Sequence, residues 1–309
     1  MRLLIGTRGS ALARAQASDV ARRLEVLGHT TETVVISTVG DRAADRAFAE
    51  VGSFGVFVRE IENALLEGRV DVAVHSYKDL PSRGPDGLVV AAVPERVDAA
   101  DVLLARPEVA DAADGEIPLR HGGSVGTAAA RRQALLHAAR PDLSIGLLRG
   151  NVPTRLRALA EGRFGAIVLA AAGLERLERT TAAGGTPLMP AEIVGTRLDP
   201  RSFVPAPAQG AIAVQVRVDA HAVREAVSAL DDPRPARALR AERRLLGLVE
   251  AGCDRPFGAW CDEASGGALT LFAVLGQGAG GITRAAATGD DPEALAASVW
   301  HQLASGVRA

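Results

Sequence analysis

Short apolar or β-branched segments alternate with helical segments through the first two thirds of this 309-residue chain. A clear example is Val70–Val74, which alternates like a strand and follows a helical repeat that ends near Gly68. Such alternation is typical of βαβ units, which build a mostly parallel sheet covered by helices. We therefore expect an α/β fold in this part of the chain.

The alternation begins again near Asp98, and the pattern changes after Asp219 to two helical segments, further strands and a closing helix. A chain of this length is too long for one ordinary core. We predict two α/β lobes with a cleft and a small α+β C-terminal domain. The expected boundaries are residues 1–96 with 200–218 for domain 1, 97–199 for domain 2 and 219–309 for domain 3.

The composition limits the partners that this chain can bind. Its formal net charge is −2, and its aromatic residues are one Tyr, two Trp and seven Phe. Nucleic-acid binding relies on excess positive charge or on aromatic stacking platforms, so we expect no nucleic-acid partner. No apolar run is long enough to cross a membrane, and the amino terminus lacks the apolar core of a secretory signal. We expect a cytoplasmic protein with no membrane partner.

The segment VHSYKDLP, Val74–Pro81, carries the first functional signal. Because proline disfavours helix at the residue before it, we expect His75–Leu80 to form a loop at a strand end. Ligands of open α/β sheets bind beyond the carboxyl ends of the strands. Lys78 and Asp79 are therefore candidate functional residues, although an adjacent Lys-Asp pair in a loop is usually just solvated.

Five arginines form the second signal. They lie at strand ends or near the starts of expected helices: Arg131, Arg132, Arg149, Arg155 and Arg176. Backbone N–H groups at such positions favour anions, and a guanidinium group binds a carboxylate through a two-pronged fork. Any one of them is as readily explained as a solvated surface arginine. Five at equivalent places favour a ligand with several carboxylates.

The two cysteines, Cys253 and Cys261, have the spacing of neither a metal site nor a disulfide framework. A free cysteine is more often a small buried hydrophobic residue than a nucleophile. Cys261, beside Trp260, fits that description better than Cys253, which follows Gly252. No cluster of His, Cys, Asp and Glu has zinc spacing, so we expect no metal.

Together these segments are similar to the hydroxymethylbilane synthase family, also called the porphobilinogen deaminase family. The matching segments follow the order of the family over essentially the whole chain: GTRGS (Gly6–Ser10) with Gln16, GVFVRE (Gly55–Glu60), HSYKDLP (His75–Pro81), ARRQ (Ala130–Gln133), LRGNVPTR (Leu148–Arg155), AAAGL (Ala170–Leu174) with Arg176, PAPAQGA (Pro205–Ala211), AER (Ala241–Arg243) and EAGC (Glu250–Cys253). No single segment is decisive, but the set is highly specific.

The resemblance implies a transferase of tetrapyrrole and heme biosynthesis. Members of this family condense four porphobilinogen molecules, with release of ammonia, into a linear tetrapyrrole on a covalently bound dipyrromethane cofactor. The cofactor is attached through a thioether to the cysteine that matches Cys253. A thiolate is a good nucleophile toward the methylene formed on deamination, so the attachment needs no metal. The resemblance also implies a cytoplasmic monomer.

The resemblance assigns roles to individual residues. Asp79 is expected to be catalytic, stabilising positive charge on the pyrrole nitrogens, with Lys78 and Arg8 keeping it ionised. The residues expected to bind the cofactor are Cys253, Lys78, Asp79, Thr127, Arg131, Arg132, Arg149 and Arg155. The residues expected to bind substrate are Arg8, Gln16, Phe57, Arg149, Arg155 and Arg176.

Some positions depart from the family pattern. Ala128 and Ala129 stand where hydroxyl residues usually precede the arginine pair. Two donors to cofactor carboxylates are thereby lost, each worth about 1–3 kcal/mol. The other departures are Glu50 and Phe54, where lysines are common, and Ala208, where the family has glycine. None of them is the expected attachment or catalytic residue, so we expect an active enzyme.

The alternative is a degenerate relative that binds a polycarboxylate ligand without catalysis. Two α/β lobes joined by crossing strands resemble periplasmic ligand-binding proteins. The missing secretion signal counts against a periplasmic receptor. The presence of Cys253 at its matching place counts against lost chemistry.

Overall fold

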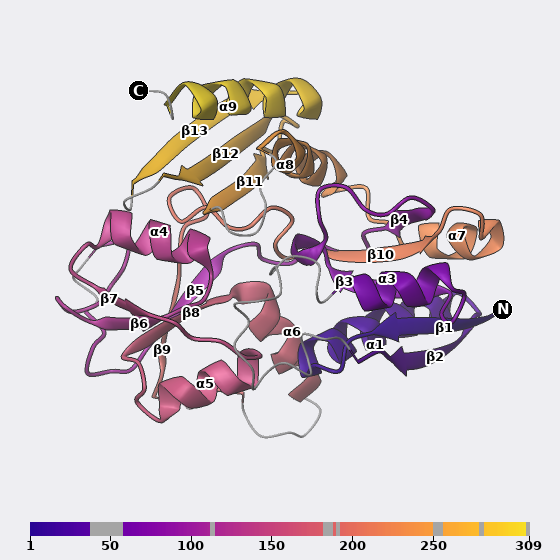
Figure 1. Cartoon of the computed structure of the whole chain (residues 1–309), viewed down its shortest axis with the longest axis horizontal. Coiled ribbons are helices and arrows are strands. Elements are labelled where there is room, and N and C mark those ends of the chain that lie inside the picture. The colour runs from indigo at the N-terminus through magenta and orange to yellow at the C-terminus, as the bar shows by residue number, and fades with distance from the viewer. Residues whose placement is uncertain are drawn as a thin grey trace. The chain divides into compact units, whose positions relative to one another are not determined.

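The computed structural model describes residues 1–37, 58–111, 115–181, 188–189, 192–249, 256–277 and 281–306. The chain divides into two compact units, Met1–Val97 with Gly210–Ala236 (unit 1) and Asp98–Gln209 with Arg237–Ala309 (unit 2). Each unit contains a five-stranded sheet, and unit 2 also holds a three-stranded sheet (Figure 1). The predicted fold class, two α/β lobes and a small α+β part, is confirmed.

The sheet of unit 1 has the strand order β2-β1-β3-β10-β4. Its strands are β1 (Arg2–Thr7), β2 (Thr30–Val35), β3 (Val72–Ser76), β4 (Leu88–Ala92) and β10 (Ile212–Arg217). β1 pairs in parallel with β2 and β3, whereas β10 runs antiparallel to β3 and β4. The expectation of a mostly parallel sheet was therefore wrong for this half of the sheet, because β10 enters it from a distant part of the chain.

Helices cover both faces of this sheet. They are α1 (Ala11–Val26), α3 (Arg59–Leu66) and α7 (His221–Ser228). α1 begins as the sequence predicts: the Ser10 hydroxyl accepts a hydrogen bond from the Ala13 N–H at 3.3 Å. It ends before Gly28, whose φ of +86° is the left-handed conformation that favours glycine. α1 and α7 share an apolar cluster with one face of the sheet, and α3 packs on the other face.

β3 extends further than the sequence indicated. His75 and Ser76, expected in a loop, pair with Ala213 and Ile212 of β10. A short 3₁₀-helix, Tyr77–Asp79, then follows instead of the expected irregular loop. The difference arises because the partner strand comes from a distant part of the sequence, which no local pattern reveals.

The five-stranded sheet of unit 2 has the order β7-β6-β8-β5-β9. Its strands are β5 (Asp101–Ala105), β6 (Ser124–Gly126), β7 (Ser144–Gly146), β8 (Ala166–Ala170) and β9 (Val194–Arg197), the last without a sequence signal. Its helices are α4 (Ala130–Ala139), α5 (Val152–Ala160) and α6 (Ala171–Thr181). α4 packs on one face, and α5 and α6 pack on the other. This sheet is also mixed, because β5 runs antiparallel to β8 and β9.

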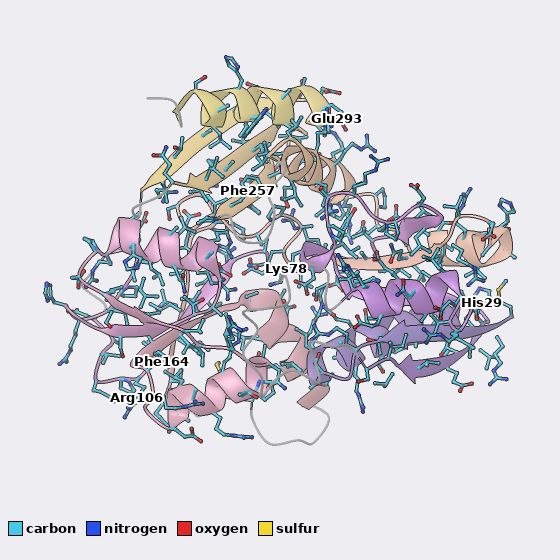
Figure 2. All side chains as sticks on the ribbon, in the orientation of Figure 1. His29, Lys78, Arg106, Phe164, Phe257 and Glu293 are labelled. Atoms are coloured by element: carbon cyan, nitrogen blue, oxygen red, sulfur yellow. The ribbon has the colours of Figure 1, made fainter. Side chains whose placement is uncertain are left out.

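The ring of Phe164 explains why β6 and β7 both end in glycine (Figure 2). A Cβ atom at Gly126 would lie 2.9 Å from the ring, and one at Gly146 would lie 2.6 Å from it. Glycine therefore lets the ring pack over both strand ends, directly before the polar segment that begins at Thr127.

The C-terminal part of unit 2 is an antiparallel sheet of β11 (Phe257–Glu263), β12 (Leu269–Gly276) and β13 (Ile282–Gly289). α8 (Ala236–Val249) and α9 (Pro292–Gly306) share one core with a single face of this sheet (Figure 1). Cys261 is buried in that core, in agreement with its expected structural role. On the other face Trp260 stacks on Phe272, with ring centroids 5.7 Å apart.

The predicted boundaries of three domains stay a prediction. α7, which those boundaries place in domain 3, packs against β4 and β10 of unit 1. Residues 200–209, which they place in domain 1, belong to unit 2. No helix in the described ranges has both the length and the apolar character that crossing a membrane requires.

Candidate functional site

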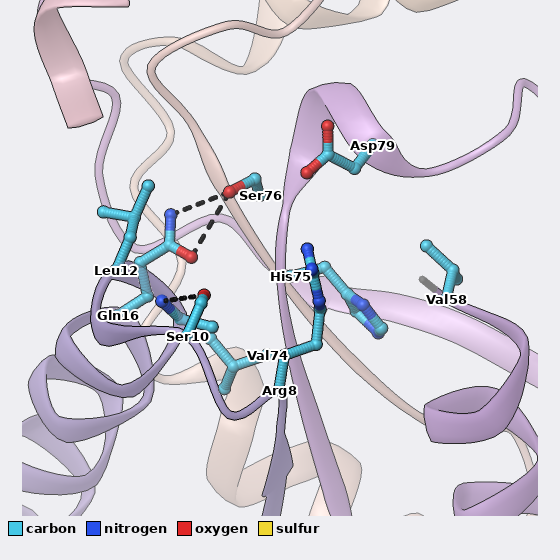
Figure 3. A pocket seen from close by; sticks show the side chains of 10 residues that line it. Arg8, Ser10, Leu12, Gln16, Val58, Val74, His75, Ser76 and Asp79 are labelled. Atoms are coloured by element: carbon cyan, nitrogen blue, oxygen red, sulfur yellow. Dashed lines mark hydrogen bonds between the residues drawn. The ribbon is translucent and has the colours of Figure 1, made fainter. Parts of the chain in front are cut away.

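The segment that carries Asp79 lines a pocket in unit 1 (Figure 3). The pocket has a volume of about 80 Å³, room for a side group of a ligand rather than for a chain of rings. Its polar lining residues are Arg8, Ser10, Gln16, His75, Ser76 and Asp79. β1 and β3 pair in parallel, so the residues that follow their carboxyl ends meet at one edge of the sheet. This arrangement brings together three of the predicted residues, Arg8, Gln16 and Asp79.

Arg8 and Asp79 point into this pocket (Figure 3). Asp79 is exposed, and Arg8 is half-buried. A carboxylate can accept hydrogen bonds from the N–H groups of a ligand, and a guanidinium group can bind an acidic side group of the same ligand. Lys78 lies on the same 3₁₀-helix (Figure 2) but is not among the residues that line the pocket.

Gln16 is buried on α1 and is held in place by Ser76. The Gln16 Nε2 donates a hydrogen bond to the Ser76 Oγ at 2.9 Å. Gln16 was among the residues expected to bind substrate, whereas its partner Ser76 was not. The signal for Ser76 was its position beside Asp79 at the end of a strand.

His75 lies beneath the pocket in a buried polar network. Its Nε2 and the Gln215 Oε1 are 3.1 Å apart, and the Gln215 Nε2 donates to the Glu62 Oε1 at 3.1 Å. Burial, assisted by the charge of Arg8, lowers the pKa of His75 to about 4. Burial also raises the pKa of Glu62. His75 is therefore a neutral, hydrogen-bonded residue at pH 7, and no group of side chains in the described ranges could hold a metal ion.

Arg131 and Arg132 lie in the first turn of α4 and are buried, with exposed fractions of 7% and 5%. Both bind Asp101, the fully buried first residue of β5. The Asp101 Oδ2 accepts from the Arg131 Nη2 at 2.8 Å, and the Oδ1 accepts from the Arg132 Nη2 at 2.7 Å. Burial alone would raise the pKa of Asp101, but the two guanidinium charges outweigh it and hold that pKa well below its ordinary value. The Asp101 side chain is therefore a carboxylate between two cations.

Positive charge exceeds negative charge around the arginine pair. Asp101 is the only carboxylate that the described residues bring within salt-bridge distance of Arg131 and Arg132. The Arg132 Nε is buried and has no hydrogen-bond partner among the described residues. Burial and the nearby charge of Arg132 lower the pKa of Arg155 to about 10. A buried donor without a partner and a destabilised cation both favour an anionic ligand at this place.

The other predicted residues of unit 2 lie in different environments. Arg155 donates from its Nε to the Gly150 carbonyl oxygen at 2.7 Å. Arg149 is exposed, whereas Arg176 is buried on α6. Thr127, expected to bind the cofactor, lies before α4: the N-cap residue is Ala129, whose N–H donates to the Thr127 Oγ1 at 3.2 Å. Phe57, Cys253, Glu50 and Phe54 lie outside the described residues.

Three buried residues near the arginine pair received no role from the sequence: Asp101, and Gln209 and Glu242 of the matched segments PAPAQGA and AER. The Gln209 Nε2 donates to the Asp101 Oδ1 at 2.9 Å and to the Ala99 carbonyl oxygen at 2.7 Å. Glu242 is fully buried on α8, and its carboxylate accepts hydrogen bonds from the backbone N–H groups of Ala208 and Cys261. Asp101 itself lay in no recognisable motif. For Glu242 a signal existed, because a carboxylate on the apolar face of a helix requires polar partners.

Comparisons with known proteins agree with the predicted family. Residues 3–225 match the family model described as porphobilinogen deaminase, dipyromethane cofactor binding domain. A porphobilinogen deaminase of Syntrophobacter fumaroxidans is 43% identical over 88% of this chain and 83% of its own length. A porphobilinogen deaminase of Roseiflexus castenholzii is 40% identical over 97% of this chain and 95% of its own length.

Solved structures with a similar arrangement include an ancestral cationic amino acid solute binding protein. It is 13% identical and has a TM-score of 0.48 over 74% of this chain and 87% of its own. The periplasmic binding protein STM4351 of Salmonella typhimurium is 13% identical, with a TM-score of 0.43 over 74% of this chain and 91% of its own. The family match spans more than half of the chain and the sequence relatives span most of it. This chain therefore belongs to the porphobilinogen deaminase family.

Proposed function

We propose that this chain is a hydroxymethylbilane synthase, a transferase that joins four porphobilinogen molecules head to tail into a linear tetrapyrrole. Each porphobilinogen carries an acetate and a propionate group, so the growing chain accumulates carboxylates. The observation that carries the proposal is the excess of positive charge at the buried Arg131 and Arg132 and the half-buried Arg155. A polycarboxylate ligand would supply the missing negative charge.

The described residues also fit a dipyrromethane cofactor. Such a cofactor carries four carboxylates, and the unpartnered Arg132 Nε is a donor for one of them. Arg131, Arg149 and Arg155 are the further candidates in unit 2, and Cys253 is the proposed attachment residue. When bound, this cofactor would supply the free pyrrole α-carbon to which the first substrate is added.

Each condensation breaks the C–N bond of an aminomethyl group and releases ammonia. The methylene carbon then bonds to the α-carbon of the acceptor pyrrole, which loses its hydrogen as a proton. Positive charge develops on the substrate ring when ammonia leaves. The Asp79 carboxylate is suited to stabilise this charge by accepting the pyrrole N–H, because preorganised polar groups act where charge develops. Arg8, in the same pocket, is suited to bind an acidic side group of the ring.

Asp79 is proposed as the catalytic carboxylate, and Lys78 and Gln16 as residues that hold the substrate or Asp79 in place. The buried pairing of Gln16 with Ser76 supports this assignment, because a side chain held by packing and a second hydrogen bond positions a ligand well. We also propose a cytoplasmic location, as expected for a biosynthetic enzyme of this family.

Replacement of Asp79 tests the proposal directly. We expect Asp79→Asn to retain its fold and cofactor but to lose at least about a thousandfold in turnover, as expected for loss of a principal electrostatic group. Product formation from porphobilinogen is the measurement, with circular dichroism to check the fold. Asp86→Asn, at an exposed carboxylate of the same unit, is the matched control and should keep normal turnover. Normal turnover in Asp79→Asn would remove this residue from the mechanism.

A further inference from the structure

Glu242 links α8 to the backbone of two neighbouring segments of unit 2. Its side chain is fully buried on α8. The Glu242 Oε1 accepts a hydrogen bond from the Cys261 N–H of β11 at 2.8 Å. In the sequence, α8 ends at Val249 and β11 begins at Phe257, so these elements flank the segment that includes Cys253. One carboxylate therefore joins α8 to β11, the two elements between which Cys253 lies in the sequence.

The other oxygen of Glu242 binds the segment that supports the arginine pair. The Glu242 Oε2 accepts from the Ala208 N–H at 2.7 Å. Ala208 has a φ of +59°, a left-handed conformation that costs a non-glycine residue about 1–2 kcal/mol. The hydrogen bond to Glu242 helps to hold this conformation. The next residue, Gln209, donates to Asp101, which binds both Arg131 and Arg132.

A second set of contacts links the same two regions. The Arg131 Nη1 donates to the Val204 carbonyl oxygen at 2.7 Å, and the Ala259 N–H donates to the Pro205 carbonyl oxygen at 3.0 Å. The packing here leaves no spare room: a Cβ atom at Gly258 would lie 2.7 Å from the Val204 carbonyl oxygen and 3.0 Å from the Arg131 Cδ. Residues 204–205 thus bind both β11 and Arg131.

We propose that Glu242 is a positioning residue for the cofactor: it holds α8 and β11, the elements on either side of the proposed attachment residue Cys253 in the sequence, at a fixed place relative to the arginine pair. The inference rests on the proposed function. A ligand that is covalently attached at one point and bound by charge at another gains from both only if the two points are held in one geometry. A buried carboxylate with one oxygen on each region provides that restraint.

Glu242→Gln is the informative variant, because it keeps the shape of the side chain. An amide presents one oxygen and one NH₂ group, so one of the two backbone N–H groups would face a donor. Glu263→Gln is the matched control: Glu263 belongs to the same C-terminal sheet and pairs with Arg237, but it contacts neither Ala208 nor Cys261.

The test is a double-mutant cycle between position 242 and the attached cofactor. The thermal midpoint of each loaded protein is compared with that of the same protein carrying Cys253→Ser, and intact mass gives the loaded fraction. We expect the gain in midpoint on loading to be unchanged in Glu263→Gln and to fall to less than about half of the wild-type gain in Glu242→Gln. The loaded fraction of Glu242→Gln should fall as well.

A merely structural role would lower the loaded and unloaded midpoints of Glu242→Gln equally. An unchanged gain and an unchanged loaded fraction in that variant would therefore overturn the inference while leaving the proposed function intact. A wild-type protein with neither the added mass nor a gain on loading would overturn both. If Glu242→Gln does not fold, Gln209→Leu breaks the same chain of contacts at Asp101. The same reduction in midpoint gain and in loaded fraction is then expected of it, and no change in either would overturn the inference.

Discussion

His75 shows how a single buried residue beneath the pocket links stability to pH. Its pKa is lowered to about 4 in the folded protein, against 6.5 as its ordinary value, chiefly by burial. Between these values the unfolded chain binds a proton that the folded protein does not. Folding stability is therefore present in full above pH 6.5 and decreases as the pH falls toward 4. The difference corresponds to roughly 3 kcal/mol at its limit.

His75→Gln should remove most of this pH dependence. Glutamine can still donate a hydrogen bond to Gln215 but does not titrate. The contribution of position 75 to the free energy of unfolding should therefore not change between pH 6.5 and 4 in this variant. Urea unfolding at several pH values measures the slope. Replacement of the exposed His121 by Gln is the control and should leave the slope of the wild type in place. An equally steep slope in His75→Gln would contradict the account.

The arginine pair shows that one residue type can serve two purposes. Arg131 and Arg132 form a buried ion network with Asp101, so part of their hydrogen-bonding capacity holds the fold together. Asp101 neutralises only one of the two guanidinium charges, so a ligand can bind the remaining positive charge and the Arg132 Nε. The expectation from sequence, in which these arginines simply point at a ligand, described only the second purpose.

At the scale of elements, the start of α4 lacks a side-chain cap. Ala129 is the N-cap residue, with φ of −83° and ψ of 115°, and it makes no side-chain hydrogen bond to the helix. These angles are those of an ordinary N-cap, and a serine there would accept a bond from a first-turn N–H. The helix that carries the arginine pair therefore lacks a common stabilising group.

Ala129→Ser should stabilise the protein by about 1 kcal/mol, the usual contribution of a serine cap over alanine. Ala128→Ser is the matched control, because position 128 precedes the N-cap and should give a much smaller change. Chemical denaturation of both variants measures the difference. Equal effects of the two substitutions would show that capping of α4 is not the cause.

Most elements were predictable from local sequence, and the exceptions have a common origin. α5, β8 and α8 form where periodicity and the flanking polar, proline or glycine residues define them locally. β9 and the last two residues of β3 were missed. Each depends on a partner strand that comes from a distant segment, β5 for β9 and β10 for β3. Pairing of this kind leaves no local signal.

The candidate site divides in the same way. Arg8, Gln16 and Asp79 were predictable because they follow strand ends in recognisable motifs, and the parallel pairing of β1 and β3 brings them to one pocket. Asp101 and Gln209 could not be predicted, because their role depends on the side chains that they bind in the folded protein. A buried aspartate at the start of a strand is identifiable only after the guanidinium groups around it have been located.

At the scale of the whole molecule, the two units repeat one arrangement. In each five-stranded sheet, the second strand from one edge pairs in parallel with both of its neighbours. The remaining two strand pairs of the sheet are antiparallel. The corresponding strands are β1 in unit 1 and β6 in unit 2. Arg8 follows the first, and the segment from Thr127 to Arg132 follows the second. Each unit thus presents cationic side chains beyond equivalent strand ends, where α/β sheets bind ligands.

Covalent attachment of the cofactor is the central claim for the molecule as a whole. The intact mass of the purified protein, measured beside a Cys253→Ser variant, tests it most directly. The account predicts that the wild type exceeds its sequence mass by two linked pyrrole units, or gains them on incubation with porphobilinogen, and that the variant never does. A wild-type mass equal to that of the unmodified sequence, before and after incubation with porphobilinogen, would contradict the account and favour a ligand-binding protein without catalysis.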